Sequence, residues 1–88
     1  MRADDTLLEF PCDFDVKAMG KPEGDFRALV SELVGAHVDG LRDEQITENP
    51  SSGGKYVAVT VRVQAQSREQ LDAIYQSLTD EPRVLVAL

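Results

Sequence analysis

Residues 56–65 alternate strictly between apolar and polar side chains, and this pattern limits the possible folds more than any other feature of the sequence. A period of two with one apolar side is typical of a strand that buries one face and exposes the other. Because 88 residues make one small domain, the buried face has to be covered by helices of the same chain. The apolar side consists of Val57, Val59, Val61, Val63 and Ala65.

Two other segments have the helical period. Residues 23–38 carry one continuous apolar stripe, and Glu23 and Asp25 are expected in its first turn, where the helix dipole favours negative charge. A capping box formed by Ser67 and Gln70 predicts the start of a second helix. The two stripes are Phe26, Leu29, Val30, Leu33, Val34 and His37 in the first segment, and Leu71, Ile74, Tyr75 and Leu78 in the second.

The remaining strands follow from shorter patterns. Residues 12–19 alternate like residues 56–65, residues 45–49 form a weak strand before Pro50, and residues 83–88 are rich in β-formers. The predicted order is therefore β-α-β-β-α-β, which indicates an α+β, ferredoxin-like plait. Its antiparallel sheet has the strand order 4-1-3-2, with both helices on one face. Residues 1–88 form the single domain, and residues 1–11 form an N-terminal arm.

Charge and composition exclude several classes of function. The formal net charge is −7, which argues against binding a nucleic-acid backbone or an anionic membrane surface. No apolar run approaches the ~20 residues of a membrane span, and no signal peptide is expected at the N-terminus. One cysteine, Cys12, excludes an internal disulfide and a cysteine-based zinc site, so we expect a reducing, cytoplasmic setting.

His37 and Cys12 are the first residues to consider for catalysis or metal binding. A general base needs an orienting partner and a cleft, whereas His37 lies near a predicted helix end, so we expect it to help satisfy terminal carbonyls. A reactive thiol needs a cationic, exposed setting, whereas Cys12 is on the inward phase next to Asp13, so we expect an inert thiol. With one histidine and scattered carboxylates, no metal site or cofactor is predicted.

Two other motifs have a structural interpretation beside a functional one. Asp13 and Asp15 could form a carboxylate pair, but Lys17 and Arg62 share the open sheet face, so we expect cross-strand ion pairs. The glycine-rich residues 51–54 could cradle a phosphate. They lead into a strand rather than a helix, so we expect a hairpin turn.

The last strand is predicted at an edge of the sheet. It is apolar on both phases, and we expect it to have no proline, bulge or lysine to prevent pairing with another chain. Either the arm at residues 7–11 covers it or another chain does. The predicted interaction edge is Val84, Leu85, Val86, Ala87 and Leu88.

Several short motifs together resemble the YbeD-like family. The resemblance covers nearly the whole chain, and its most specific part is the opening with the Lys-x-Met-Gly strand end. Gly24 departs from the helix initiator expected there, which bears on the helix boundary. The motifs are Leu7-Leu8-Glu9-Phe10-Pro11, Phe14, Lys17, Met19-Gly20, His37, Gly40, Pro50-Ser51-Ser52, Tyr56 and the Val-Leu-Val ending.

The resemblance implies a small cytoplasmic bacterial protein with a fold like the ACT domain, a module that binds amino acids and regulates metabolic enzymes. It also implies a genomic association with lipoate-attachment enzymes. By this likeness, a small metabolite would bind near Met19, Gly20 and Lys21. We therefore expect a non-catalytic regulatory module that forms a homodimer or binds a protein partner. The alternative is a protein–protein adaptor without a small-molecule ligand, whose acidic helical face meets a basic partner; an enzyme is the weakest of the three classes.

Overall fold

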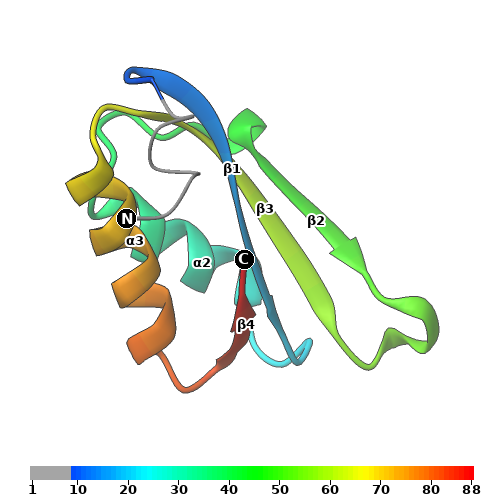
Figure 1. Ribbon diagram of the computed structural model, residues 1–88. Helices are drawn as coiled ribbons and strands as arrows, with labels where there is room; N and C mark the ends of the chain where they lie inside the picture. The colour runs from blue at the N-terminus through cyan, green and yellow to red at the C-terminus, as the bar shows by residue number, and fades with distance from the viewer. Residues whose placement is uncertain (1–8) are drawn as a thin grey trace.

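The computed structural model describes residues 9–88, apart from the side chain of Ser52. A four-stranded antiparallel sheet has the order β2-β3-β1-β4, and α2 and α3 lie together on one side of it (Figure 1). This confirms the predicted ferredoxin-like plait, because the order read from the other edge is 4-1-3-2. The elements are β1 (Cys12–Gly20), α2 (Phe26–Gly35), η1 (Asp43–Gln45), β2 (Ile46–Pro50), η2 (Ser52–Gly54), β3 (Val57–Ala65), α3 (Arg68–Asp80) and β4 (Val84–Ala87).

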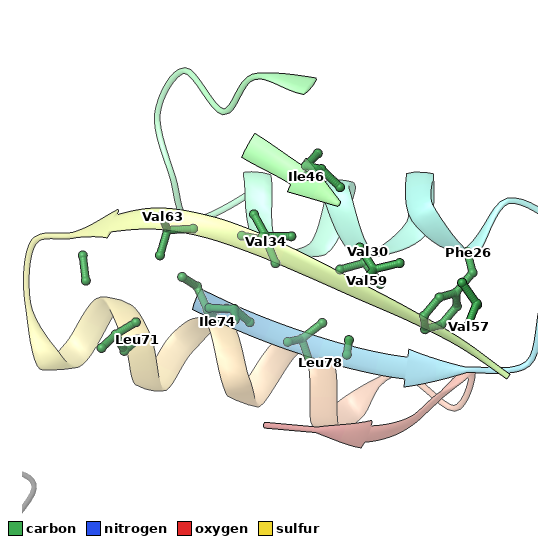
Figure 2. Packing of buried hydrophobic residues seen from close by; sticks show 14 residues of the cluster. Phe26, Val30, Val34, Ile46, Val57, Val59, Val63, Leu71, Ile74 and Leu78 are labelled. Carbon is green, nitrogen blue, oxygen red and sulfur yellow. The ribbon is translucent and has the colours of Figure 1, made fainter. Parts of the chain in front are cut away.

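The core lies between the sheet and the two helices. β1 and β3 pair along all nine residues of each strand, which places Val16 opposite Val61. The inward side of β3 is buried throughout, so the strict alternation in the sequence corresponds to one buried face, as expected. Figure 2 shows the helix side chains meeting this face. The buried helix residues are Phe26, Val30, Val34, Leu71, Ile74 and Leu78.

Helix α2 is shorter than predicted. It covers residues 26–35 rather than 23–38 because Asp25 caps it: Asp25 Oδ1 accepts the backbone N–H of Ala28 at 3.0 Å. Gly24 has a φ of +61°, outside the helical region, so the chain turns before the cap. Glu23 and Asp25 therefore precede the first turn instead of lying in it. Beyond the helix, a second glycine, Gly40, adopts a φ of +68°.

The other boundaries agree closely with the sequence. Ser67 caps α3 by accepting the Gln70 N–H at 3.1 Å, as the capping box predicted. β2 begins one residue later than expected and includes Pro50, and β1 extends to Gly20. Among residues 9–88, no helix combines the length and the apolar character needed to cross a bilayer.

Candidate functional site

The two edges of the sheet differ in how far they are protected. At the β2 edge, Pro50 has no N–H and Glu48 adds an exposed carboxylate. Arg27 of α2 also donates to the backbone oxygens of Asp43 and Ile46, at 3.1 and 3.4 Å. Proline and charge are common protection against pairing with another chain. The β2 edge is therefore a poor docking site.

The β4 edge has an irregular register. β4 pairs with the end of β1, and the register shifts between Met19, opposite Val86, and Gly20, opposite Val84. Leu85 is thus the extra residue of a β-bulge. This corrects the expectation of an edge without a bulge. The Val84 N–H donates to the Glu81 carbonyl oxygen at 3.0 Å. This donor is therefore used in the turn before β4 and does not bond to β1.

Beyond the bulge, β4 resumes a regular ladder. Lys17 and Leu88 exchange two backbone hydrogen bonds, of 3.1 and 2.8 Å. In an antiparallel ladder the neighbouring residue then turns its N–H and C=O away from the partner strand. That residue is Ala87, which pairs with Ala18. Its backbone groups face the outside of the sheet, where residues 9–88 contribute no further strand. Leu7 and Leu8 of the arm that was expected as one possible cover lie outside the described residues.

Apolar side chains surround these outward groups. Leu85, Val86 and Leu88 are 52%, 44% and 66% exposed, and they are three of the four large exposed apolar side chains within residues 9–88. Val86 lies opposite Met19 and Leu88 opposite Lys17, on the sheet face away from the helices. We call Leu85, Val86, Ala87 and Leu88 the β4 edge. Of the predicted interaction residues, Val84 precedes this edge, and the side chains of Val84 and Ala87 both pack against the core, so Ala87 presents its backbone rather than its side chain.

The far end of the β4 edge is held by α3. The Tyr75 hydroxyl donates to the Leu88 backbone oxygen at 2.6 Å, and the Tyr75 ring contacts Phe14 edge-on at 6.4 Å between centroids. Burial raises the pKa of Tyr75, so the hydroxyl keeps its proton for this bond. The edge is therefore held in an extended conformation by contacts outside the sheet. The helical pattern indicated Tyr75 only as part of an apolar stripe.

Gly20, within the predicted ligand site, is packed by the protein itself. A Cβ there would stand 2.5 Å from the Arg83 carbonyl oxygen and 2.5 Å from Phe26 Cε1. The absence of a side chain thus makes room for Phe26 and not for a ligand on that side. Next to it is a hollow of about 190 Å³, lined by Lys21, Glu23, Pro82, Arg83 and Leu85. Ligand binding by Met19, Gly20 and Lys21 stays a prediction.

An ion pair joins neighbouring strands on the open face of the sheet. Arg62 Nε and Nη2 donate to Asp15 Oδ1 and Oδ2 at 2.9 and 3.3 Å, as expected from their shared face. The hydrogen bond from Arg62 is the largest cause of a lowered Asp15 pKa. A wide polar hollow of about 330 Å³ lies beside the pair, and its lining residues are Asp15, Glu44, Gln45, Thr47, Thr60 and Arg62.

We expect Arg62→Gln to raise the pKa of Asp15 toward its ordinary value of 3.8. Because the folded-state pKa is depressed, the pair stabilises the fold above the ordinary pKa. This contribution is lost as the pH falls through the folded-state value. NMR titration of the Asp15 carboxyl carbon in both proteins measures the shift. An unchanged Asp15 pKa in the variant would show that Arg62 is not its cause.

His37 connects the helices rather than satisfying helix carbonyls with its ring. Its Nε2 lies 2.7 Å from Ser77 Oγ on α3, and Gln70 donates to its backbone oxygen at 2.9 Å. No sequence pattern indicated Ser77 as the partner of His37, because the two residues are 40 positions apart. Cys12 is a half-buried free thiol at the margin of the core. Within residues 9–88, no group of three His, Cys, Asp or Glu side chains could hold a metal ion.

Residues 51–54 form the turn between β2 and β3. Gly53 and Gly54 have φ values of +82° and +72°, and the Ser51 hydroxyl accepts the Tyr56 N–H at 3.0 Å. This agrees with the hairpin turn expected from the sequence. The positive φ values explain the pair of glycines there without a phosphate ligand.

The family is decided by the sequence comparisons. Residues 5–88 match a family described as "Protein of unknown function (DUF493)". The chain belongs to this family. A UPF0250 protein of Paraburkholderia phymatum is 44% identical over 84 residues, which is 96% of this chain and 94% of that protein. A UPF0250 protein of Nitrosomonas europaea is 38% identical over 85 residues, or 97% and 98% of the two chains. The YbeD-like resemblance is thereby confirmed, for a family whose function is uncharacterised.

A solved structure supports the fold of this DUF493 chain. The solution structure of protein HP0495 from H. pylori superimposes with a TM-score of 0.73. The alignment covers 92% of this chain and 85% of that one, at 16% identity. At that identity the likeness concerns the fold alone. Neither comparison points to catalysis by a DUF493 protein, and neither assigns a ligand.

Proposed function

We propose that this DUF493 protein is a non-catalytic binding module that docks an extended segment of another protein along the β4 edge. The observation that carries the proposal is the outward-facing backbone of Ala87 between the exposed side chains of Leu85 and Leu88. An extended peptide can add to such an edge, with main-chain hydrogen bonds providing affinity and alternate side chains providing specificity. This corresponds to the adaptor alternative, without a small-molecule ligand.

The contrast between the two sheet edges supports this proposal. Pro50, Glu48 and Arg27 protect β2, whereas within residues 9–88 β4 has a bulge at Leu85 but no proline or charged residue of its own. Tyr75 holds the end of the β4 edge in place, so little conformational freedom is lost when a strand pairs with it. We expect the docking to occur in the cytoplasm, as predicted from the single cysteine.

Metabolite sensing of the ACT-like kind, including a link to lipoate-related enzymes, has weaker geometric support. The hollow beside Lys21 measures about 190 Å³, below the roughly 300–1,000 Å³ usual for small-molecule sites. Gly20 offers no open approach, because Phe26 and the Arg83 carbonyl fill the space beside it. A rise in melting temperature with a mixture of free amino acids would favour this second function.

We expect Ala87→Pro to abolish docking without unfolding the protein. Proline removes the outward N–H of residue 87 and places its ring at the edge, where the peptide would pair. The fold should survive, because the Ala87 N–H makes no hydrogen bond to β1. Peptides that bind the wild-type chain are first selected from a displayed library of short random peptides. Their affinities for the wild type and the variant are then compared by fluorescence anisotropy. We expect a loss of about tenfold or more, equivalent to about 1.4 kcal/mol.

Ala87→Gly is the matched control, since it keeps the N–H, and we expect it to bind the selected peptides. Amide chemical shifts of the wild type provide a second readout that needs no variant. Peptide binding should move the signals of the β4 edge and leave those of β2 in place. If no peptide is enriched, or if the selected peptides bind Ala87→Pro as tightly as the wild type, the proposed function is wrong.

A further inference from the structure

A hollow of about 380 Å³ lies where β3 ends, on the β2 side of the sheet. Its volume is within the roughly 300–1,000 Å³ usual for small-molecule sites. Four of its seven lining residues are glutamines, and only Asp39 carries a formal charge, so side-chain amides dominate its chemistry. The lining residues are His37, Val38, Asp39, Gln45, Gln64, Gln66 and Gln70.

The backbone of β3 faces alternately toward β1 and toward β2. Lys17 directs its N–H and C=O groups to β4, so its neighbour Val16 directs its own to β3, where Val16 pairs with Val61. Val61 and every second residue of β3 therefore bond to β1. Arg62 and Gln64 are out of phase with Val61, so they direct their backbone groups to the β2 side.

β2 does not extend far enough to pair with Gln64. It begins at Ile46, which lies opposite the residue before Arg62. At Arg62 a side chain takes the place of the strand, because Gln45 Nε2 donates to the Arg62 backbone oxygen at 2.8 Å. The backbone oxygen of Gln64 accepts Gln66 Nε2 at 3.4 Å. The Gln64 N–H faces the hollow, where residues 9–88 place no strand.

Two of the amides are held in fixed orientations on the walls of the hollow. Gln45 Oε1 accepts the Arg42 N–H at 2.9 Å, in addition to the bond that its Nε2 makes to β3. Gln70 Oε1 accepts the Gln66 N–H at 2.7 Å, and its Nε2 donates to the His37 backbone oxygen at 2.9 Å. A carboxamide has two N–H donors and two acceptor lone pairs. Each of these half-buried amides therefore keeps one N–H and one lone pair for a ligand.

We propose that this hollow binds a small uncharged molecule through a primary carboxamide group. Such a group carries a donor beside an acceptor, which matches the spare lone pair and N–H of Gln45 and Gln70. The Gln64 N–H is a further donor to the carbonyl oxygen of the ligand. Val38, which packs against the core, provides an apolar wall for the carbon skeleton, and the Asp39 carboxylate disfavours anions.

The hollow is separate from the other candidate sites, and the inference goes beyond the proposed docking function, which uses no small molecule at the β4 edge. β4 and β2 are opposite edges of the sheet. Gly20, within the ligand site predicted from the sequence, pairs with Val57 at one end of β3, whereas Gln64 lies at the other end. Changes in amide signals therefore assign a bound ligand to one of these sites.

The test uses three probes that share a pyridine ring and differ in one substituent. Nicotinamide carries the carboxamide, nicotinate carries a carboxylate, and 3-acetylpyridine keeps the carbonyl group but has no N–H donor. We expect nicotinate to bind at least about tenfold more weakly than nicotinamide, because it lacks the donor and is repelled by Asp39. 3-Acetylpyridine should bind about threefold more weakly, the effect of one ordinary hydrogen bond.

NMR titration of the wild-type chain locates the bound probe without any variant. Nicotinamide should move the side-chain NH₂ signals of Gln45 and Gln70 and the backbone amide signal of Gln64. The signals of the β4 edge should stay in place.

Gln70→Glu tests the role of the amide. Glutamate keeps an oxygen for the Gln66 N–H and suits the start of a helix as well as glutamine does, so the variant should fold. It removes the NH₂ group and adds a negative charge to the hollow. We expect the affinity for nicotinamide to fall at least about tenfold. Gln76→Glu is the matched control, because it makes the same change at an exposed position of α3 outside the hollow.

Several results would overturn the inference. These are equal affinity for nicotinamide and nicotinate, signal changes away from the hollow, and no signal change at the solubility limit of nicotinamide. An equal loss of affinity in Gln76→Glu and Gln70→Glu would also show that the Gln70 amide does not hold the ligand. None of these measurements involves a peptide at the β4 edge, so the docking proposal stands or falls separately.

Discussion

Ile74→Ala should lower the free energy of unfolding by about 2–5 kcal/mol, the range for truncating a buried isoleucine to alanine. Ile74 is fully buried on α3 and belongs, with Leu78 one turn later, to the core between the helices and the sheet (Figure 2). A domain of this size has a stability on the order of 4–13 kcal/mol. The variant therefore loses a large share of its stability. Urea unfolding followed by circular dichroism measures the change.

The control for Ile74→Ala is Gln76→Ala on the same helix. Gln76 is exposed and donates to Asp80 Oδ1 at 2.9 Å, a surface contact one turn apart. We expect a change within about 0.5 kcal/mol, as for most surface substitutions. A loss below about 1 kcal/mol in Ile74→Ala would contradict the packing of α3 on the sheet described above.

Gly20→Ala should lower the free energy of unfolding by about 1–3 kcal/mol, because one added methyl group overpacks a filled space. The new Cβ would lie 2.5 Å from both Phe26 Cε1 and the Arg83 carbonyl oxygen. The phenyl ring can shift, but the carbonyl belongs to the backbone that leads into β4. The variant should therefore also move the amide signals of β4.

Gly35→Ala makes the same chemical change at the end of α2, and we expect the opposite sign. The nearest atom to its new Cβ would be Leu41 Cδ2, at the ordinary contact distance of 3.7 Å. Alanine favours a helix over glycine by up to about 1 kcal/mol. Chemical denaturation of both variants tests the pair. A neutral Gly20→Ala would mean that the space beside Gly20 is open, which would favour the ligand prediction for Met19, Gly20 and Lys21.

The architecture was predictable because its signals are local. Alternation in residues 56–65 specifies a strand buried on one face, and the Ser67 cap marks where α3 begins. Both depend on residues a few positions apart. The same holds for the turn at residues 51–54, where two glycines provide the positive φ values. The predicted end of α2 at residue 38 was wrong: the apolar stripe continues past Gly35, the last residue of the helix.

The details of the candidate site were not predictable, because they depend on contacts between distant residues. The Leu85 bulge arises where the turn at Glu81 takes a backbone donor of Val84. Tyr75 reaches Leu88 only when α3 and β4 are packed together. Gly20 is surrounded by Phe26 and Arg83, which are separated from it by 6 and 63 positions in the chain.

The sequence by itself determined the order of strands and helices, the face of each that is buried, and the apolar character of the last strand. Only the tertiary structure decided that Arg27 protects the β2 edge, that Ala87 faces outward, and that Lys17, Lys21 and Arg83 surround β4. Periodicity reports which side of an element meets the core. The neighbours of an edge strand depend on how whole elements pack, and that arrangement exists only in the folded chain.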